Sequence, residues 1–490
     1  MSEAEGMNTN VRRRSALVLV FVLGLVVLTV CGCMVGPNYI PPQTPSPPGW
    51  SGSEKTPVKE PPIASIGELD LTRWWRQLND PILTTLVEEA VKSNLDLKSA
   101  VVRLRQARAA KGIASGAFWP SISSSSGYQW GQKAGASGEQ NLFQAGLDSV
   151  WELDLFGGKR RAIESADASI EAAIEGIRAV QVSLVAEVAL NYIQLCSYQQ
   201  EILIAQSNLK AQQRTAEITH KRYDVGFASA LDVANADSIV AVTDAQIPVY
   251  EIAERQSIYA LSVLLALPPA DLLEKLTPRG NLPDVPTEVP SGLPSDLLRR
   301  RPDIRESEAQ LHAATAQIGA AIADYFPEFS LTGAVSWNSN LLQTWWSGSS
   351  RSFGIGPSVN WRIFQGGAIE SNVHVQEALR DQAFIAYQKT VLAAFQDVEN
   401  ALIAFTKEQQ HRTALNSAVV ANRKAVDLSV QLYSEGQTDF LNVATAQRSL
   451  YVTEDALVQS YRTIATDFIA LYKALGGGGE PLQSRVPLTH

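Results

Sequence analysis

Strict alternation of apolar and polar residues marks four segments of the chain. In the clearest segment, every second position is apolar, namely at Phe353, Ile355, Pro357, Val359, Trp361 and Ile363. A period of two over ten or more residues predicts strands with one apolar face. We therefore expect one hairpin of strands at about 118–130 and 142–155, and a second at about 326–337 and 352–364.

A different period follows each predicted hairpin. Residues 157–223 and 366–433 contain no proline, and each stretch is far longer than the usual helix of about 11–12 residues. Apolar side chains recur there at steps of three and four, at Val185, Val188, Tyr192, Leu195, Phe395, Val398, Leu402 and Phe405. This spacing predicts two long helices that pack against other helices. A glycine can end each of them, and returning helices are expected at 229–265 and 439–475.

The two halves of the chain repeat each other. Asp96-Leu97 and Phe118-Trp119-Pro120 match Asp303-Ile304 and Tyr325-Phe326-Pro327, and the match continues past both long helices. We therefore divide the chain into repeat 1 (76–266), a linker (267–295), repeat 2 (296–475) and a flexible tail (476–490). Repeats of this kind must be recognised before a fold is assigned.

Four strands are too few for a closed structure. They cannot form a sandwich core alone, and a membrane barrel needs at least eight strands. The chain must therefore oligomerise, and three copies would supply 12 strands. Tryptophans near the strand ends favour a membrane barrel over a soluble β-sandwich. From periodicity alone, a coiled-coil rod without a lumen remains an alternative for the helices.

The N-terminal residue pattern predicts an export signal. Arg12, Arg13 and Arg14 precede an apolar run from Ala16 to Val30, a pattern typical of a signal peptide. An N-terminal membrane anchor is the alternative, although the run is short for a span of about 20 residues. Residues 30–33 (Val-Cys-Gly-Cys) resemble a bacterial lipobox. The resemblance implies a signal peptide of 1–32, N-palmitoyl and S-diacylglycerol groups on Cys33, and an outer-membrane destination.

Composition excludes several classes of protein. Residues 37–62 hold nine of the 24 prolines, so residues 33–75 are expected to form an extended, lipid-anchored tether. The net charge of −9 argues against a nucleic-acid partner. A mean hydropathy near zero excludes a bundle of membrane-spanning helices. We find no catalytic constellation, no histidine pair with metal-ligand spacing and no cofactor motif, so an enzyme is not expected. Cys196, the one thiol left after processing, is expected to be a small buried hydrophobe.

Several long motifs resemble one family. They are Arg73-Trp74-Trp75, Asn94-Leu95-Asp96-Leu97 and the run from Leu293 to Arg305. They are similar to the signatures of TolC-like outer-membrane factors of tripartite efflux pumps, in the lipoprotein, NodT-like branch. The resemblance implies a mixed α and β membrane protein, a homotrimer with a 12-stranded outer-membrane barrel continued by a long periplasmic α-helical barrel. It also implies a periplasmic adaptor and an inner-membrane RND-type pump as partners.

The resemblance also implies site residues. Tyr223, Gly226, Tyr433 and Gly436 correspond to the tips on which adaptors dock. Asp232, Leu441, Thr445 and Arg448 correspond to the closed periplasmic gate. Thr445 and Asn442 stand where the family often has Asp, which leaves mainly Asp232 and Asp237 in the acidic ring and gives Leu441 more of the closure.

The sequence thus favours a passive outer-membrane exit duct for small toxic compounds. Two alternatives stay open, namely a duct for type I protein secretion and a non-conducting structural lipoprotein of the envelope. Nothing in the sequence identifies the cargo.

Overall fold

A computed structural model describes residues 34–50, 71–132, 138–278, 282–286 and 299–479. The chain divides into two compact units. The sheet unit contains the described residues within Met1–Gln43, Arg103–Ile174 and Glu306–Gln388. The helix unit contains those within Thr44–Val102, Glu175–Arg305 and Lys389–His490. The predicted signal peptide and Cys33 lie outside the described residues.

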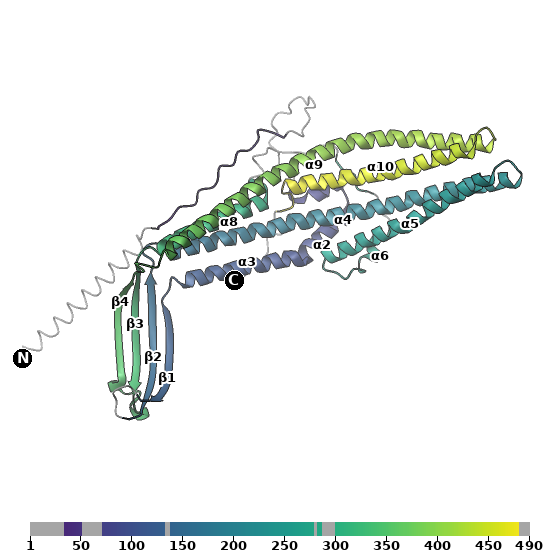
Figure 1. Ribbon diagram of the computed structural model, residues 1–490. Coiled ribbons are helices and arrows are strands. Elements are labelled where there is room, and N and C mark those ends of the chain that lie inside the picture. The colour runs from purple at the N-terminus through teal and green to yellow at the C-terminus, as the bar shows by residue number, and fades with distance from the viewer. Residues whose placement is uncertain (1–33, 51–70, 133–137, 279–281, 287–298, 480–490) are drawn as a thin grey trace, which may run out of the picture. The chain divides into compact units, whose positions relative to one another are not determined.

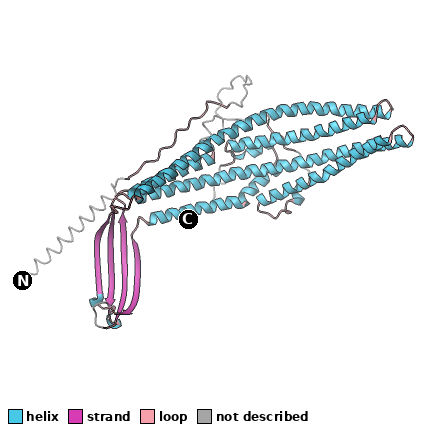
Figure 2. Ribbon diagram, in the orientation of Figure 1, coloured by secondary structure: helices cyan, strands magenta, loops and turns pink. Residues whose placement is uncertain are grey.

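The sheet unit contains one antiparallel sheet of four strands in chain order (Figures 1 and 2). These are β1 (Ser121–Gly131), β2 (Gln140–Leu153), β3 (Glu328–Ser339) and β4 (Arg351–Asn360). Both predicted hairpins are present. In addition, β2 of repeat 1 pairs with β3 of repeat 2 from Phe143↔Ser339 to Leu153↔Phe329. The two hairpins therefore form one continuous sheet.

The register gives the sheet two unlike faces. Leu147 pairs with Val335, which in turn pairs with Phe353, so apolar side chains of neighbouring strands share one face. That apolar face carries Ile122, Tyr128, Trp130, Phe143, Leu147, Trp151, Leu331, Val335, Trp337, Phe353, Ile355 and Val359. The opposite face carries Ser123, Ser125, Gln144, Asp148, Glu152, Ser330, Thr332, Ser352 and Ser358. Most of the apolar side chains are exposed in the single chain.

The four long helices begin and end within two residues of the expected positions. They are α4 (Gly158–Asp224), α5 (Ala230–Leu264), α9 (Ala368–Ser434) and α10 (Phe440–Ala474). At 1.5 Å per residue, α4 and α9 would each measure about 100 Å along their axes. Pro248 lies inside α5, a position at which one backbone hydrogen bond of the helix is lost.

Among the described residues, three further helices of more than ten residues were not among the expected elements. These are α2 (Pro81–Ser93), α3 (Leu95–Gly116) and α8 (Pro302–Ala323). The last two have the same length and lie 207 residues apart, so they are equivalent elements of the two repeats. Asp80 caps α2, because its Oδ1 accepts hydrogen bonds from the backbone N–H groups of Ile82 and Leu83.

The core of the helix unit corrects two expected boundaries. Trp74 and Trp75 were assigned to the tether that ends at residue 75, yet both are fully buried. They lie in a 3-10 segment, Leu71–Leu78, and pack among apolar residues of α2, α4, α5 and α10. A tryptophan side chain has a large apolar surface, so its burial stabilises the fold far more than its exposure in a tether would.

The glycines after α10 correct the second boundary. Residues 476–479 were expected to begin a flexible tail, but Gly477, Gly478 and Gly479 are buried. The Gly478 N–H donates to the carbonyl of Leu71, and the Gly478 carbonyl accepts from Gln181. A Cβ on Gly477 would lie 3.0 Å from the Trp74 ring, so glycine allows this close packing. Residues 480–490 lie outside the described residues.

Part of the linker also packs on this core. A short helix, α6 (Leu273–Leu276), lies within 267–295. Leu272 and Leu276 are buried in the same apolar cluster as Trp74. The linker therefore contributes to the helix unit rather than only joining the repeats.

Candidate gate and docking tips

Both predicted tip turns end their helices in the same way. Gly226 and Gly436 have positive φ values of 84° and 77°. The N–H of each glycine donates to the carbonyl three residues earlier, and the next N–H donates to the carbonyl five residues earlier. This is the Schellman arrangement, in which a left-handed glycine closes the helix end. The glycines are thus required by the turn itself.

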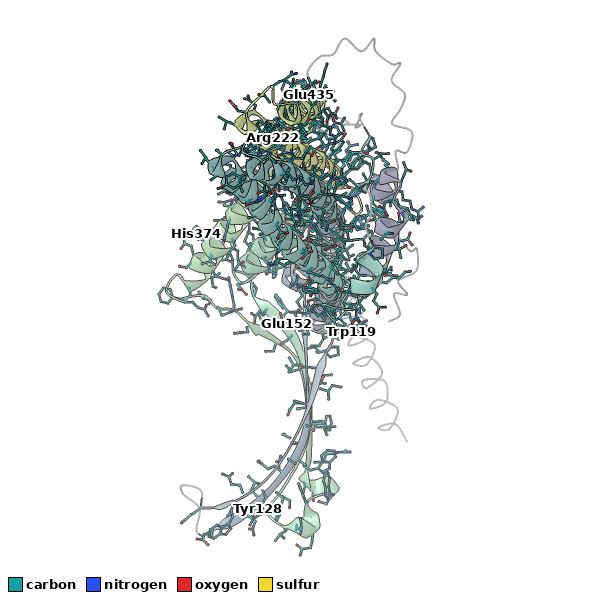
Figure 3. The ribbon with its side chains drawn as sticks, turned by 90° about the vertical axis from the view of Figure 1, so that its right-hand side faces the viewer. Trp119, Tyr128, Glu152, Arg222, His374 and Glu435 are labelled. Atoms are coloured by element: carbon teal, nitrogen blue, oxygen red, sulfur yellow. The ribbon has the colours of Figure 1, made fainter. Side chains whose placement is uncertain are left out.

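Arg222 joins the two tips to each other. Its Nη1 donates to the carbonyl oxygens of Tyr433 at 2.7 Å and Ser434 at 3.3 Å. Its guanidinium carbon lies 4.8 Å from the centroid of the Tyr433 ring, which adds a cation–π contact. Arg222 and Glu435 are labelled at this end of the helix unit in Figure 3. Tyr433 was predicted as a docking residue, and its contact with Arg222 was not predicted.

The two tip tyrosines differ in exposure. Tyr223 is 47% exposed, whereas Tyr433 is 3% exposed and packs with Phe440 and Val443. Tyr433 therefore belongs to the interior of the tip, which differs from the expectation that it contacts a partner. Val225 and Phe227, which were not predicted, are 66% and 75% exposed in the first tip.

Three of the predicted gate residues share one face of α10. Leu441, Thr445 and Arg448 are spaced four and three residues apart, and all three are exposed. This spacing places them on the same side of a helix. The opposite side of the same turns is buried, at Val443, Ala444 and Gln447. No described residue forms a hydrogen bond or ion pair with the Arg448 guanidinium.

The acidic gate residues have other partners. Asp232 forms a capping box at the start of α5, because its Oδ2 accepts from the Ser229 N–H and hydroxyl at 2.9 and 2.8 Å. Asp237 lies 2.9 Å from Nε2 of His220 on α4. The sequence predicted both residues as parts of an acidic ring, and the structure adds a local stabilising role for each. Asp232 lies on α5 and does not contact the α10 gate residues in any described hydrogen bond or ion pair.

A row of polar contacts links α4 to α10 below the tips. Thr215 accepts a hydrogen bond from Gln447 at 2.8 Å, and Asn208 donates to Glu454 at 2.9 Å. Arg423 of α9 donates to the same Glu454 carboxylate at 2.7 Å. Arg423 is exposed, but Thr215, Gln447, Asn208 and Glu454 are buried. Their contacts therefore fix how α4 and α10 align.

A further contact between α4 and α10 joins Glu201 to Arg462 and contains a carboxyl group with a shifted pKa. Burial raises the pKa of Glu201 to about 7, although Arg462 opposes the shift. The Arg462 Nη1 lies 3.6 Å from Glu201 Oε1, and Asp455 adds a like charge nearby. The α4–α10 contact therefore contains a group that changes its charge near neutral pH.

The predicted lipid site cannot be placed, because Cys33 lies outside the described residues. Cys196, by contrast, is 1% exposed, and burial raises the pKa of its thiol to about 12. The expectation that Cys196 is a buried hydrophobe is confirmed.

Comparison with known proteins agrees with this architecture. A family model described as outer membrane efflux protein matches residues 86–266 and 293–477. Nodulation protein T of Rhizobium leguminosarum bv. trifolii is 31% identical over 459 residues, which is 93% of this chain and 96% of that protein. The toluene efflux pump outer membrane protein TtgC of Pseudomonas putida is 32% identical, with 95% of each chain covered.

Solved structures give the same result. The structure of the outer-membrane channel OprN has a TM-score of 0.84 and 34% identity, and the match covers 92% of this chain and all of that one. The open state of the MtrE outer membrane channel of Neisseria gonorrhoeae has a TM-score of 0.77 and 27% identity, with 91% and 98% covered. The predicted mixed fold and the predicted function are confirmed. This chain belongs to the outer membrane efflux protein family and is an outer-membrane efflux channel with a helical periplasmic extension.

Proposed function

We propose that three copies of this chain form a passive exit duct for small toxic compounds. In this proposal an inner-membrane RND-type pump supplies the energy and selects the cargo, and a periplasmic adaptor connects the pump to the duct. The observation that carries the proposal is the four-stranded sheet with one apolar and one polar face.

The edges of the sheet argue for association. Among the described residues, β1 and β4 each pair with a strand on one side only. Lipid cannot satisfy the free N–H and C=O groups of an open edge, so a sheet in a membrane must close on itself. Pairing of β4 of one copy with β1 of the next would close the ring, and three copies give 12 strands. The apolar face would then meet lipid, and the serine-rich face would line the lumen.

The tips supply a surface for the adaptor. Tyr223, Val225 and Phe227 expose apolar side chains in the first tip turn, and exposed clusters of this kind mark protein contacts. Gly226 and Gly436 hold the turns in place, and Tyr433 supports them from inside. We expect the adaptor to contact the first tip more extensively than the second.

In this proposal, exposed residues of α10 form the gate. Three copies of Leu441 would narrow the lumen near the axis, and an apolar constriction can close a pore by excluding water. Thr445 and Arg448 lie on the same exposed face, and Asp232 shapes the start of α5 beside the tip. Because the exposed charge on α10 is basic, three converging Arg448 residues would repel one another unless anions or carboxylates balance them.

The remaining features concern anchoring and chemistry. We propose N-palmitoyl and S-diacylglycerol groups on Cys33, because residues 30–33 resemble a lipobox. Labelled palmitate should enter the wild-type protein and not the Cys33→Ala variant, and labelling of the variant would contradict the assignment.

We also propose that the chain catalyses no reaction, since a duct requires none.

Two measurements on the purified full-length protein test the duct. Its mass should correspond to three processed chains, each lacking residues 1–32 of the 53.1 kDa sequence. Planar bilayers should show channel currents that increase when Leu441 and Arg448 are both replaced by Ala. A protein that associates but never conducts, even with this double replacement, would be a structural lipoprotein. Export of a protein substrate, with no effect on resistance to small toxic compounds, would instead favour the secretion duct.

A further inference from the structure

The loop between β3 and β4 is rich in hydroxyl groups that form hydrogen bonds within the loop. We call residues 340–350 the tryptophan loop. It contains two 3-10 turns, Leu342–Thr344 and Gly348–Ser350. Hydroxyl–hydroxyl contacts of 2.7 Å (Ser339 to Thr344) and 2.8 Å (Ser347 to Ser349) hold these turns, and Ser350 donates to the Thr344 carbonyl at 2.7 Å. A loop with this many internal bonds presents its side chains in fixed positions.

The tryptophan loop folds onto the apolar face of the sheet. Trp345 lies 5.7 Å from the ring of Phe143, and its indole N–H donates to the carbonyl of Trp337. Trp346 lies 5.0 Å from Trp345 and 5.5 Å from Trp337. Phe143 and Trp337 are both residues of the apolar face. The loop therefore follows the surface that faces lipid and does not extend into the surrounding water.

The exposed groups of this region combine three chemistries. Trp346 is 64% exposed, and Leu341 and Leu342 are each 59% exposed. Arg351 pairs with Trp337 across β3 and β4, which places Arg351 on the same face. Within the described part of the chain, no carboxylate forms an ion pair with Arg351. An indole, two aliphatic side chains and an unpaired guanidinium thus lie together at one end of the sheet.

Chain connectivity shows on which side of the membrane the loop end of the sheet lies. The chain enters β3 at Glu328 after α8 and leaves β4 at Asn360 before α9. The helices extend into the periplasm, so the tryptophan loop lies at the outer surface of the membrane. Figure 3 shows Tyr128 at the loop end of the sheet and Trp119 and Glu152 at the opposite end.

We propose that the tryptophan loop and Arg351 form a binding site for a phosphorylated glycolipid of the outer leaflet. The guanidinium of Arg351 would bind the phosphate with two parallel N–H donors. Trp346 would stack on a sugar ring, and Leu341 and Leu342 would contact acyl chains. The apolar face continues directly into this site, and the charge of Arg351 complements a phosphate. The proposal rests on the membrane barrel of the proposed function.

An ordinary aromatic girdle is the competing explanation, because membrane barrels carry tryptophans at both interfaces. Trp130 allows the aromatic girdle and the glycolipid site to be distinguished. It is 59% exposed, lies on the apolar face at the same end of the sheet and pairs with Asn141 on β2. A girdle would use Trp130 and Trp346 alike, whereas a glycolipid site requires Trp346 and Arg351.

The test measures glycolipid retention by native mass spectrometry. The full-length protein in phosphatidylethanolamine nanodiscs is titrated with a diphosphorylated lipid A, with its dephosphorylated form and with phosphatidylglycerol. We expect Arg351→Gln to weaken binding of the diphosphorylated glycolipid about tenfold or more, and Arg351→Lys to restore part of it. Trp346→Ser should also weaken binding, while Trp130→Ser should match the wild type.

Three results would overturn the site. They are wild-type binding by Arg351→Gln, equal losses in Trp130→Ser and Trp346→Ser, or equal affinity for phosphatidylglycerol. Channel conductance is recorded on the same preparations. A wild-type protein that neither assembles nor conducts contradicts the proposed function, whereas variants that conduct normally and lose the glycolipid confirm the site.

Discussion

The guanidinium of Arg222 donates to the carbonyl of Tyr433 at 2.7 Å and lies 4.8 Å from the centroid of its ring. These two residues end α4 and α9, the long helices of the two repeats. Among the described hydrogen bonds between the two helical hairpins, those of Arg222 lie at the tip turns, and the α4–α10 contacts lie further along the helices. A movement that separates the tips would break the Arg222 contact.

Replacement of Arg222 by Ala should therefore favour the open duct. A hydrogen bond from a charged group contributes about 1.5–3 kcal/mol, and partial exposure reduces this to about 1–2 kcal/mol, equivalent to roughly a five- to thirtyfold shift in the equilibrium. Single-channel recordings should show a matching rise in open probability. Arg214→Ala is the control, because Arg214 is exposed on the same helix. Equal behaviour of the two variants would contradict a role for the contact.

A second arginine holds the N-terminal segment of the described chain. Arg161 is 1% exposed and donates to the carbonyls of Val35 and Gly36 and to the side chain of Asn38. Its Nη1 also donates to Glu164 at 2.8 Å. Arg161→Ala removes the hydrogen bonds to Val35, Gly36 and Asn38, and hydrogen bonds from a charged group contribute about 1.5–3 kcal/mol each. Glu164 is partly exposed and keeps its contact with His312 at 3.1 Å. We expect the N-terminal segment to be released.

Limited digestion with chymotrypsin measures this release. Tyr39 is stacked on His312 at 4.3 Å, so the wild-type protein should resist cleavage there, and Arg161→Ala should be cut readily. Gly36→Ala tests the same contact independently, because the added Cβ would lie 2.4 Å from the Cα of Gly319. Resistance at Tyr39 in both variants would show that other contacts hold the segment.

The stability of the helix unit should depend on pH through Glu201. Its pKa in the folded protein, about 7, is above the ordinary value of 4.5, so the fold favours the neutral carboxyl. This stabilisation is complete below pH 4.5 and is lost as the pH rises through 7. Glu201→Gln should therefore melt above the wild type at pH 8 and show a smaller change between pH 5 and pH 8. Glu217→Gln, at an exposed position of α4, should keep the wild-type pH dependence; identical profiles for both variants would exclude Glu201.

The gate should depend on the apolar character of Leu441. Leu441→Ser would wet the constriction, and we expect closed-state current through planar bilayers to rise several-fold. Val452→Ser is a matched control, because Val452 is 58% exposed and lies about three turns along the same face of α10. An increase that is equal in both variants would place the constriction elsewhere.

Periodicity alone was sufficient to predict the strands and the long helices. Alternation in β2 and β4 arises because one face of the sheet is apolar and the other is polar, and the three-four spacing in α4 and α9 arises because one side of each helix packs on other helices. Both patterns can be recognised within a single segment. The repeat also matched α3 to α8, although neither was recognised as a helix. In α3 only Ala100 and Leu104 are buried, and many buried side chains of α8 are small or polar, such as Ser307, Ala309 and Thr315. The apolar period of both helices is therefore weak in the sequence.

Contacts between distant segments could not be predicted. Tyr223 and Tyr433 occupy the same place in the two repeats, and only Tyr433 is buried. The residue before Tyr433 is Leu432, which cannot donate a hydrogen bond from its side chain, whereas Arg222 before Tyr223 reaches across to the second tip. The capping of α5 by Asp232 and the burial of Trp74 likewise depend on neighbours that the residue patterns do not identify.

The pairing of β2 with β3 has a consequence for the evolution and symmetry of the assembly. In a ring of three chains, six hairpins would meet at six seams, three within chains and three between them. A hairpin would experience almost the same neighbours on both sides, so the ring approximates sixfold symmetry although only a threefold axis is strict. Duplication and fusion of a shorter ancestral gene would have preserved such a ring, and the two copies could then diverge, as the unlike tips show.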